Sequence, residues 1–145
     1  MRNFDSNLYN IGNLADKRFE EILDKAKTRV ANHFRIPKYL FNAKFEISHL
    51  PEIYGFVSER FGNYVIGSFR KVGKTLGEFI PYANKAFIDP INLSNFRRLY
   101  ETIVHELVHE AQLINGKIGK LPRYALEAEA SAVSKILTGN LQTYF

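Results

Sequence analysis

The sequence predicts an α+β domain in which a helix comes first, a small and mostly antiparallel β-sheet follows, and two further helices come last. Three observations lead to this prediction. Apolar residues recur at intervals of three and four towards both ends of the chain, as on amphipathic helices. Between them, short runs of β-branched and aromatic residues are separated by Gly, Pro and Asn, as in strands joined by turns. No repeat or linker divides the chain, so we expect one domain over residues 1–145.

The first helix is expected over residues 14–34. Charged residues separate apolar positions that would share one face of a helix, and Pro37 follows the segment. The apolar positions are Leu14, Phe19, Ile22, Leu23, Ala26 and Val30. This face predicts packing against the remainder of the domain.

Two strands are expected next. The segment AKFEISHLP, residues 43–51, places Phe45, Ile47 and His49 on one face, as a half-buried strand does. The segment YVIGSFR, residues 64–70, is rich in residues that favour strands.

Residues 76–90 predict a hairpin. Two extended runs meet at Ala83 and Asn84, and asparagine tolerates the positive φ that a tight turn needs. Pro81 within the first run predicts an edge position, because proline cannot donate to a strand ladder. We also expect an exposed sheet edge at residues 85–89, where an extended substrate would pair.

Two helices are predicted after the hairpin. The first covers residues 95–114, with Ser94 or Asn92 as its N-cap and with Asn115-Gly116 at its end. The second has the sequence RYALEAEASAVSKIL, with Pro122 in its first turn and Gly139 after its end.

The stretch TIVHELVHEAQ on the first of these helices carries a candidate metal site. His105 and His109 lie about 40° apart around the helix axis and about 6 Å apart along it, so their imidazoles project to one point. Glu106 is rotated by about 100° and flanks that point. This is the pattern H-E-x-x-H, in which two histidines hold zinc and the glutamate takes a proton from the zinc-bound water. The alternative is an ordinary helix with two histidines on its surface.

A third ligand is required, since catalytic zinc usually has three protein ligands and one open position. The chain has no cysteine, and its other histidines, His33 and His49, precede the motif. A carboxylate of the last helix must therefore serve, either Glu127 or Glu129. In a helix hairpin His109 and Glu127 come level, while Glu129 lies about 160° round the helix from Glu127, so only one of the two faces the metal. The other is expected to be a solvated charge.

With these residues in place, the chain resembles the zinc metallopeptidases called gluzincins, whose ligands are the two histidines of H-E-x-x-H and a glutamate on a following helix. The segment EAEASAVSKIL is similar to the glutamate helix of ImmA- and IrrE-like peptidases, and the order of elements over residues 43–138 looks most like the single-domain minigluzincins. The resemblance implies a zincin-like fold and a zinc metalloendopeptidase that cleaves peptide or protein substrates. It implies that His105, His109 and Glu127 hold Zn²⁺ and that Glu106 is the catalytic general base.

The chain departs from the gluzincin pattern at two positions. Glu110 follows the second histidine, where the family usually has an uncharged residue, and Ser131 stands where thermolysin-like members have an aspartate. No histidine follows the motif to stabilise the transition state, which leaves Tyr124 and Tyr82 as candidate donors to an oxyanion.

The charge pattern offers an alternative function. The net charge is +5, and aromatic residues alternate with Arg60, Arg70, Lys71 and Lys74, as on strands that stack nucleic-acid bases. The alternative is therefore a non-catalytic, basic nucleic-acid-binding module with a structural metal. We favour a solvated basic face of the sheet, because half-exposed strands alternate in this way without any ligand.

The sequence shows neither an apolar run of membrane-spanning length nor a hydrophobic leader. We therefore expect no membrane association and a cytoplasmic location. The sequence leaves the oligomeric state and the physiological substrate open.

Overall fold

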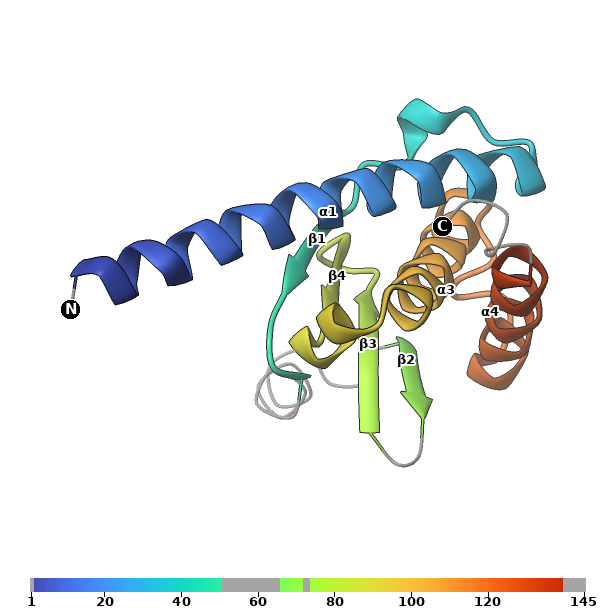
Figure 1. The fold of residues 1–145 in the computed structure, drawn as a ribbon. Coiled ribbons are helices and arrows are strands. Elements are labelled where there is room, and N and C mark those ends of the chain that lie inside the picture. Colours follow the sequence, from blue (N-terminus) through green and yellow to red (C-terminus); the bar gives the residue numbers. More distant parts are fainter. Residues whose placement is uncertain (1, 51–65, 72–73, 140–145) are drawn as a thin grey trace.

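The computed structural model describes residues 2–50, 66–71 and 74–139, with side chains for residues 18–50 and 75–139. Helices pack on a mixed four-stranded sheet, which confirms the predicted α+β class (Figure 1). No helix in the described part of the chain is long and apolar enough to cross a membrane.

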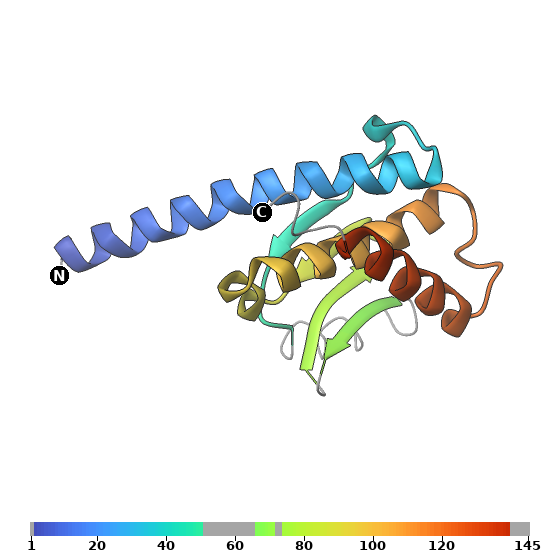
Figure 2. The same ribbon diagram turned by 45° about the vertical axis from the view of Figure 1, so that its right-hand side comes forward.

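Three α-helices and two short 3-10 helices are described. The α-helices are α1 (Arg2–Phe34), α3 (Phe96–Ile114) and α4 (Arg123–Thr138), and the 3-10 helices are η1 (Lys38–Leu40) and η3 (Pro90–Ser94). The first helix begins twelve residues before the predicted start at residue 14, since it starts at residue 2. The segment before residue 14 contains no proline, and its one glycine, Gly12, costs only about 1 kcal/mol in a helix. In Figures 1 and 2 the N-terminal end of α1 projects beyond the other elements.

The four strands are arranged in the order β1-β4-β3-β2. Their bounds are β1 (Lys44–Ile47), β2 (Ile66–Lys71), β3 (Lys74–Ile80) and β4 (Lys85–Ile88). The pairs β2–β3 and β3–β4 are antiparallel, and β1 pairs with β4 in parallel. The sheet is thus mostly antiparallel, as predicted.

The predicted hairpin is confirmed, but two expectations about sheet edges are wrong. Asn84 has φ 49° in the turn between β3 and β4, as expected for asparagine. Pro81 lies in this turn after Ile80, the last paired residue of β3, so its missing N–H removes no ladder bond and β3 is an inner strand. Residues 85–88 are not an exposed edge either, because β4 pairs with both β1 and β3.

The N-cap of α3 differs from both predicted candidates. Asn95 has extended backbone angles, and its side-chain oxygen accepts a hydrogen bond from the backbone N–H of Arg98 at 3.1 Å. Ser94 donates instead to the carbonyl of Ile91, and the amide of Asn92 donates to the carbonyls of Leu76 and Asp89. Periodicity missed η3, which occupies the residues where we placed the cap.

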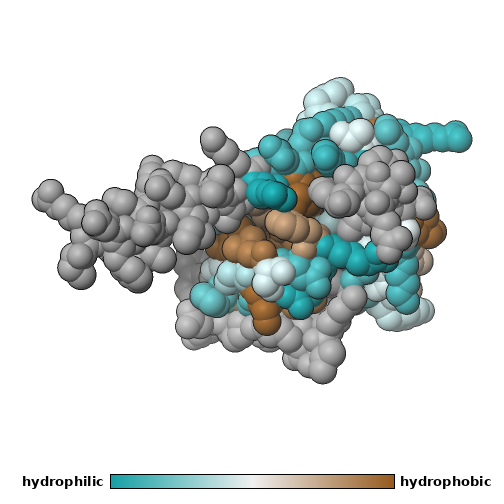
Figure 3. Space-filling view, in the orientation of Figure 1, coloured by the Kyte–Doolittle hydropathy of each residue, from teal (hydrophilic) through white to brown (hydrophobic). Residues whose placement is uncertain are grey.

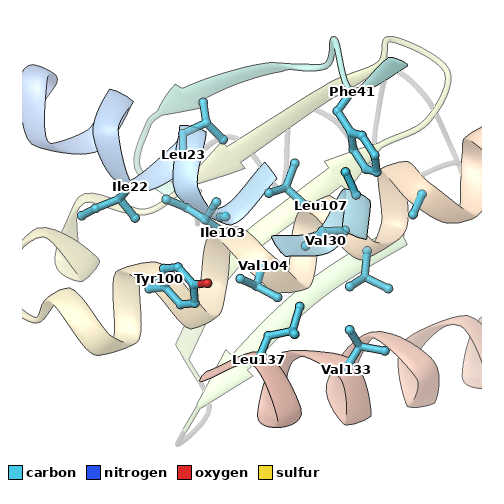
Figure 4. Packing of buried hydrophobic residues seen from close by; sticks show 14 of the residues in the cluster. Ile22, Leu23, Val30, Phe41, Tyr100, Ile103, Val104, Leu107, Val133 and Leu137 are labelled. Carbon is cyan, nitrogen blue, oxygen red and sulfur yellow. The ribbon is translucent and has the colours of Figure 1, made fainter. Parts of the chain in front are cut away.

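Helix α3 is the centre of the fold. From Leu99 to Gln112 every residue except Glu101 is buried, because α1, α4 and the sheet all pack against this helix. Side chains from α1, α3 and α4 point towards one another in Figure 4, where the labelled residues are Ile22, Leu23, Val30, Phe41, Tyr100, Ile103, Val104, Leu107, Val133 and Leu137. Figure 3 shows a group of apolar residues beneath α1 with polar residues around it. Any polar side chain on this part of α3 is therefore held inside the domain.

The cap assignment gives a stability prediction. Replacing Asn95 by Ala should lower the free energy of unfolding by about 0.5–2 kcal/mol, because the N–H of Arg98 loses its acceptor. Ser94→Ala is the matched control and should cost less, since Ser94 is exposed and does not cap α3. Urea unfolding followed by circular dichroism measures both values. A larger loss for Ser94→Ala than for Asn95→Ala would contradict the assignment.

Candidate metal centre

The two histidines of the motif face one another from successive turns of α3. Both are almost completely buried, with 1% of His105 and none of His109 exposed. Their ring centroids lie 5.0 Å apart with an angle of 71° between the ring planes. Phe79 of β3 stacks on His109 at 6.5 Å between ring centroids, so the inner strand of the sheet forms one wall of the site. The alternative of two surface histidines is therefore wrong.

Glu127 of α4 joins the two imidazoles. Its Oε1 lies 2.5 Å from Nε2 of His109 and 3.6 Å from Nε2 of His105. The three ligand atoms lie within 4.8 Å of one another, which makes the group able to hold a metal ion. Ligands about 2.0–2.1 Å from a tetrahedral zinc lie roughly 3.3 Å apart, so the observed separations bracket the spacing that zinc needs.

The electrostatics of Glu127 and His105 favour an ionised carboxylate and a neutral imidazole. Burial alone raises the pKa of Glu127, but its contacts with His105 and His109 outweigh that effect and lower the pKa to about 2. Burial also lowers the pKa of His105, although Glu127 acts in the opposite direction. An ionised carboxylate and a neutral imidazole are the forms that donate electron pairs to a cation.

Glu106 lies beside this cluster in the interior of the domain. Its side chain is fully buried, and neither carboxylate oxygen has a hydrogen-bond partner among the described residues. Burial raises the pKa of Glu106 well above its usual value, and the charges of Glu127 and Glu78 raise it further. A divalent cation held by the cluster would oppose that shift, because positive charge favours the carboxylate. The arrangement provides a group that can take up and release a proton next to a metal site.

Gly77 of β3 makes room for this carboxylate. A Cβ atom at residue 77 would lie 2.7 Å from Oε2 of Glu106 and 2.7 Å from Cγ2 of Thr102. Both distances are shorter than any ordinary contact, so a side chain here would push β3 away from α3 or displace Glu106.

The two glutamates of α4 have different surroundings. Glu127 contacts the histidines, whereas Glu129 accepts hydrogen bonds from Lys117 at 2.8 Å and from the amide of Gln112 at 3.0 Å. The predicted solvated charge is therefore wrong for Glu129, which is only one-third exposed and belongs to a polar network. Its position on the other side of the helix from Glu127 follows from the helical spacing.

Glu110, the unusual charged residue after the second histidine, has a structural partner. Its Oε2 accepts a hydrogen bond from the backbone N–H of Ala43 at 2.7 Å. Burial raises the pKa of Glu110, and this N–H opposes the change. Glu110 therefore ties the segment that enters β1 to the helix that carries the histidines.

The sequence reasoning missed Gln112. Its Oε1 lies 2.7 Å from Nδ1 of His109, one turn back on the same helix. A glutamine three residues after a metal-ligating histidine is within reach of the imidazole, and that spacing was a usable signal.

Other sequence candidates receive no support from the geometry. Tyr82 and Tyr124 are 75% and 78% exposed, so burial does not hold either side chain against the cluster. The remaining histidines, His33 and His49, are exposed and are not part of the three-residue group. The basic side chains of residues 60–74 lie outside the residues whose side chains are described.

Comparisons with known protein families, with curated proteins and with solved structures found no match to this chain. The H-E-x-x-H motif and the histidine–glutamate cluster therefore carry the functional argument by themselves.

The cluster predicts which glutamate is a ligand. Glu127→Ala should abolish stoichiometric metal uptake, because it removes one of three ligand groups, whereas Glu129→Ala should still take up one metal ion per chain at saturating metal. Metal analysis of the purified wild-type and variant proteins measures both. Retention of the ion by Glu127→Ala together with its loss from Glu129→Ala would reverse the assignment.

The contact at Gly77 predicts a local overpacking effect. Gly77→Ala should destabilise the protein by about 1–3 kcal/mol, since the new methyl group meets Glu106 and Thr102. Adding Thr102→Ser removes one of the two clashing atoms and keeps the hydroxyl that bonds to Asn92, so it should recover part of the loss. Chemical unfolding measures the free energy of unfolding of the wild type, of Gly77→Ala and of the double variant. Equal stability of wild type and Gly77→Ala would show that β3 and α3 are not tightly apposed here.

Proposed function

We propose that this protein is a zinc-dependent metallopeptidase. The observation that carries the proposal is the convergence of His105, His109 and Glu127 within 4.8 Å of one another, with the buried carboxylate of Glu106 on the adjoining turn of α3. Two imidazoles and one carboxylate leave the fourth position of a tetrahedral site open, as catalytic zinc sites do.

Zinc fits this donor set better than the hard divalent cations do. Imidazole nitrogen is a good ligand for zinc, while magnesium and calcium prefer sites made of oxygen atoms alone. When bound, zinc supplies Lewis acidity, which lowers the pKa of water and polarises a carbonyl group.

Glu106 is the proposed general base. Its carboxylate accepts a proton from the attacking water and then gives it to the amine nitrogen of the departing peptide. Burial between α3 and β3 suits this role, because a carboxyl group held away from bulk solvent keeps the proton close to the reacting atoms. Gly77 fixes the space in which the carboxylate lies.

The proposed substrate is an extended peptide. In the described part of the sheet β2 lies at one edge and contacts both α3 and α4, the helices that carry the metal ligands. A peptide that pairs with the backbone of this strand is held mainly by main-chain hydrogen bonds, which demand little of its sequence. This edge replaces residues 85–89, which the sequence had suggested.

The general-base role predicts a separation between catalysis and metal binding. Glu106→Gln should reduce peptide hydrolysis by about 10²–10⁴-fold, because an amide cannot accept the proton. The same variant should retain one zinc ion per chain, since Glu106 is not a ligand. Cleavage of a fluorogenic peptide library and metal analysis of the same samples provide the two readouts.

A matched control is Glu21→Gln on the exposed side of α1, which makes the same charge change far from the motif in sequence and should leave hydrolysis unchanged. Loss of zinc from Glu106→Gln would contradict its assignment as a base. A wild-type protein that binds zinc but cleaves no peptide, and whose affinity for single-stranded DNA falls steeply with salt, would favour the nucleic-acid-binding alternative.

A further inference from the structure

A series of hydrogen bonds on the Nδ1 side of His109 determines which ring nitrogen of this histidine carries the proton. Gln112 uses both ends of its side-chain amide: Nε2 donates to the backbone carbonyl of Leu126 at 2.9 Å and to Oε1 of Glu129 at 3.0 Å, and Oε1 lies 2.7 Å from Nδ1 of His109. Only 1% of Gln112 is exposed. Each of its polar contacts is therefore made inside the domain, at the junction of α3 and α4.

The partners of Gln112 fix the orientation of its amide. Both groups that face Nε2 are acceptors, the carbonyl of Leu126 and the carboxylate of Glu129. Turning the amide over would place Oε1 of Gln112 against the oxygens of Leu126 and Glu129. Three acceptor oxygens would then face one another without a hydrogen atom between them. Because a buried acceptor without a donor is costly, the orientation with Oε1 towards His109 is strongly preferred.

The orientation of the amide in turn fixes the tautomer of His109. The oxygen of Gln112 can only accept, so Nδ1 of His109 must carry the proton and donate it. A neutral imidazole has one N–H, which leaves the lone pair on Nε2, the atom that lies against Glu127. The opposite tautomer would turn an N–H towards the cluster and could not bind a cation there.

We propose that Gln112 is a positioning residue for the metal centre, holding His109 in the tautomer whose Nε2 lone pair faces the site. The inference rests on the proposed metal-binding function and adds a residue that the H-E-x-x-H pattern does not contain. It assigns Glu129 a supporting part, since its carboxylate keeps the amide of Gln112 in place.

Lys117 binds Glu129, the last residue of this series of hydrogen bonds. Its ammonium group contacts both oxygens of Glu129, at 3.1 and 2.8 Å, and its backbone N–H donates to the carbonyl of Gln112 at 2.9 Å. Both oxygens of Glu129 thus lie against a cation, and the carboxylate is the acceptor that faces Nε2 of Gln112. The turn after α3 therefore supports the orientation of a group on that helix.

A purely structural role for Gln112 would be to join α3 to α4 through the carbonyl of Leu126. Such a role requires a donor at position 112 but no acceptor facing His109. The two roles are separable, because the acceptor and the donor are different atoms of the same side chain.

The test compares three proteins, the wild type, Gln112→Leu and the paired exchange Gln112→Glu with Glu129→Gln. Leucine removes the acceptor at similar volume. The paired exchange keeps an acceptor towards His109 and moves the amide to position 129, where it can donate to the carboxylate at position 112, but it removes the donor to the carbonyl of Leu126. It therefore separates the acceptor that faces His109 from the donor that joins α3 to α4. Zinc affinity is measured by competition with a chelating dye, and the protonated nitrogen of His109 is identified by ¹⁵N NMR of the zinc-loaded proteins.

The proposal expects zinc affinity to fall by about 10–100-fold in Gln112→Leu, as is typical when a partner of a ligating histidine is removed. The paired exchange should bind zinc close to the wild-type level. The slowly exchanging Nδ1–H signal of His109 should be present in the wild type and in the paired exchange, and lost or rapidly exchanging in Gln112→Leu.

Wild-type affinity and an unchanged Nδ1–H signal in folded Gln112→Leu would overturn the positioning role and leave the metal site intact. A folded paired-exchange protein with the zinc affinity of Gln112→Leu would also overturn it. Should Gln112→Leu fail to fold, the paired exchange and its two single variants decide between the roles. Failure of the wild type to take up zinc at all would instead disprove the metal site itself, and the inference would fall with it.

Discussion

The fold depends on the contact between Glu127 of α4 and the two histidines of α3. The two histidines lie where α3 is surrounded by α1, α4 and the sheet and are almost completely buried, whereas the side chain of Glu127 is 26% exposed. Burying imidazoles and carboxylates without partners is unfavourable, and Nε2 of His109 and Oε1 of Glu127, which both present lone pairs in the tautomer inferred above, would be stabilised by a cation between them. The position of α4 relative to α3 is therefore set by polar groups as well as by apolar packing.

Residues around the cluster hold the helices and strands that carry it in place. Gln112 and Glu129 join α3 to α4 behind His109, Glu110 holds the start of β1 against α3, and Gly77 lets β3 approach Glu106. Each acts from a different direction, so α3 is fixed relative to the other helix and to two strands. A site that must hold ligand atoms to within a fraction of an ångström needs such support from its surroundings.

Local sequence patterns predicted the helices around the site and the hairpin turn at Asn84, because each follows from the period of a single helix or turn. They also predicted that a glutamate of α4 meets His109, but spacing left Glu127 and Glu129 open, and only the resemblance to gluzincins favoured Glu127. Patterns of this kind carry no information about pairing between distant segments. The parallel pairing of β1 with β4 and the inner position of β3 were therefore missed. The role of Gly77 was missed for the same reason, since the atoms it accommodates belong to residues 25 and 29 positions further along the chain.

Three glutamates, Glu78, Glu106 and Glu127, lie close together at the candidate metal centre and affect the stability of the domain. Burial raises the pKa of Glu106, and the charges of Glu127 and Glu78 raise it further, while Glu106 and Glu78 are both fully buried. Their mutual repulsion disfavours the compact state, whereas a divalent cation bound by the histidines and Glu127 would reduce it. A cation that binds only the folded chain also stabilises it by mass action. With the proposed metal bound, the stability of the domain would therefore depend on the ion, and α4, which contributes Glu127, would be the element most directly coupled to it.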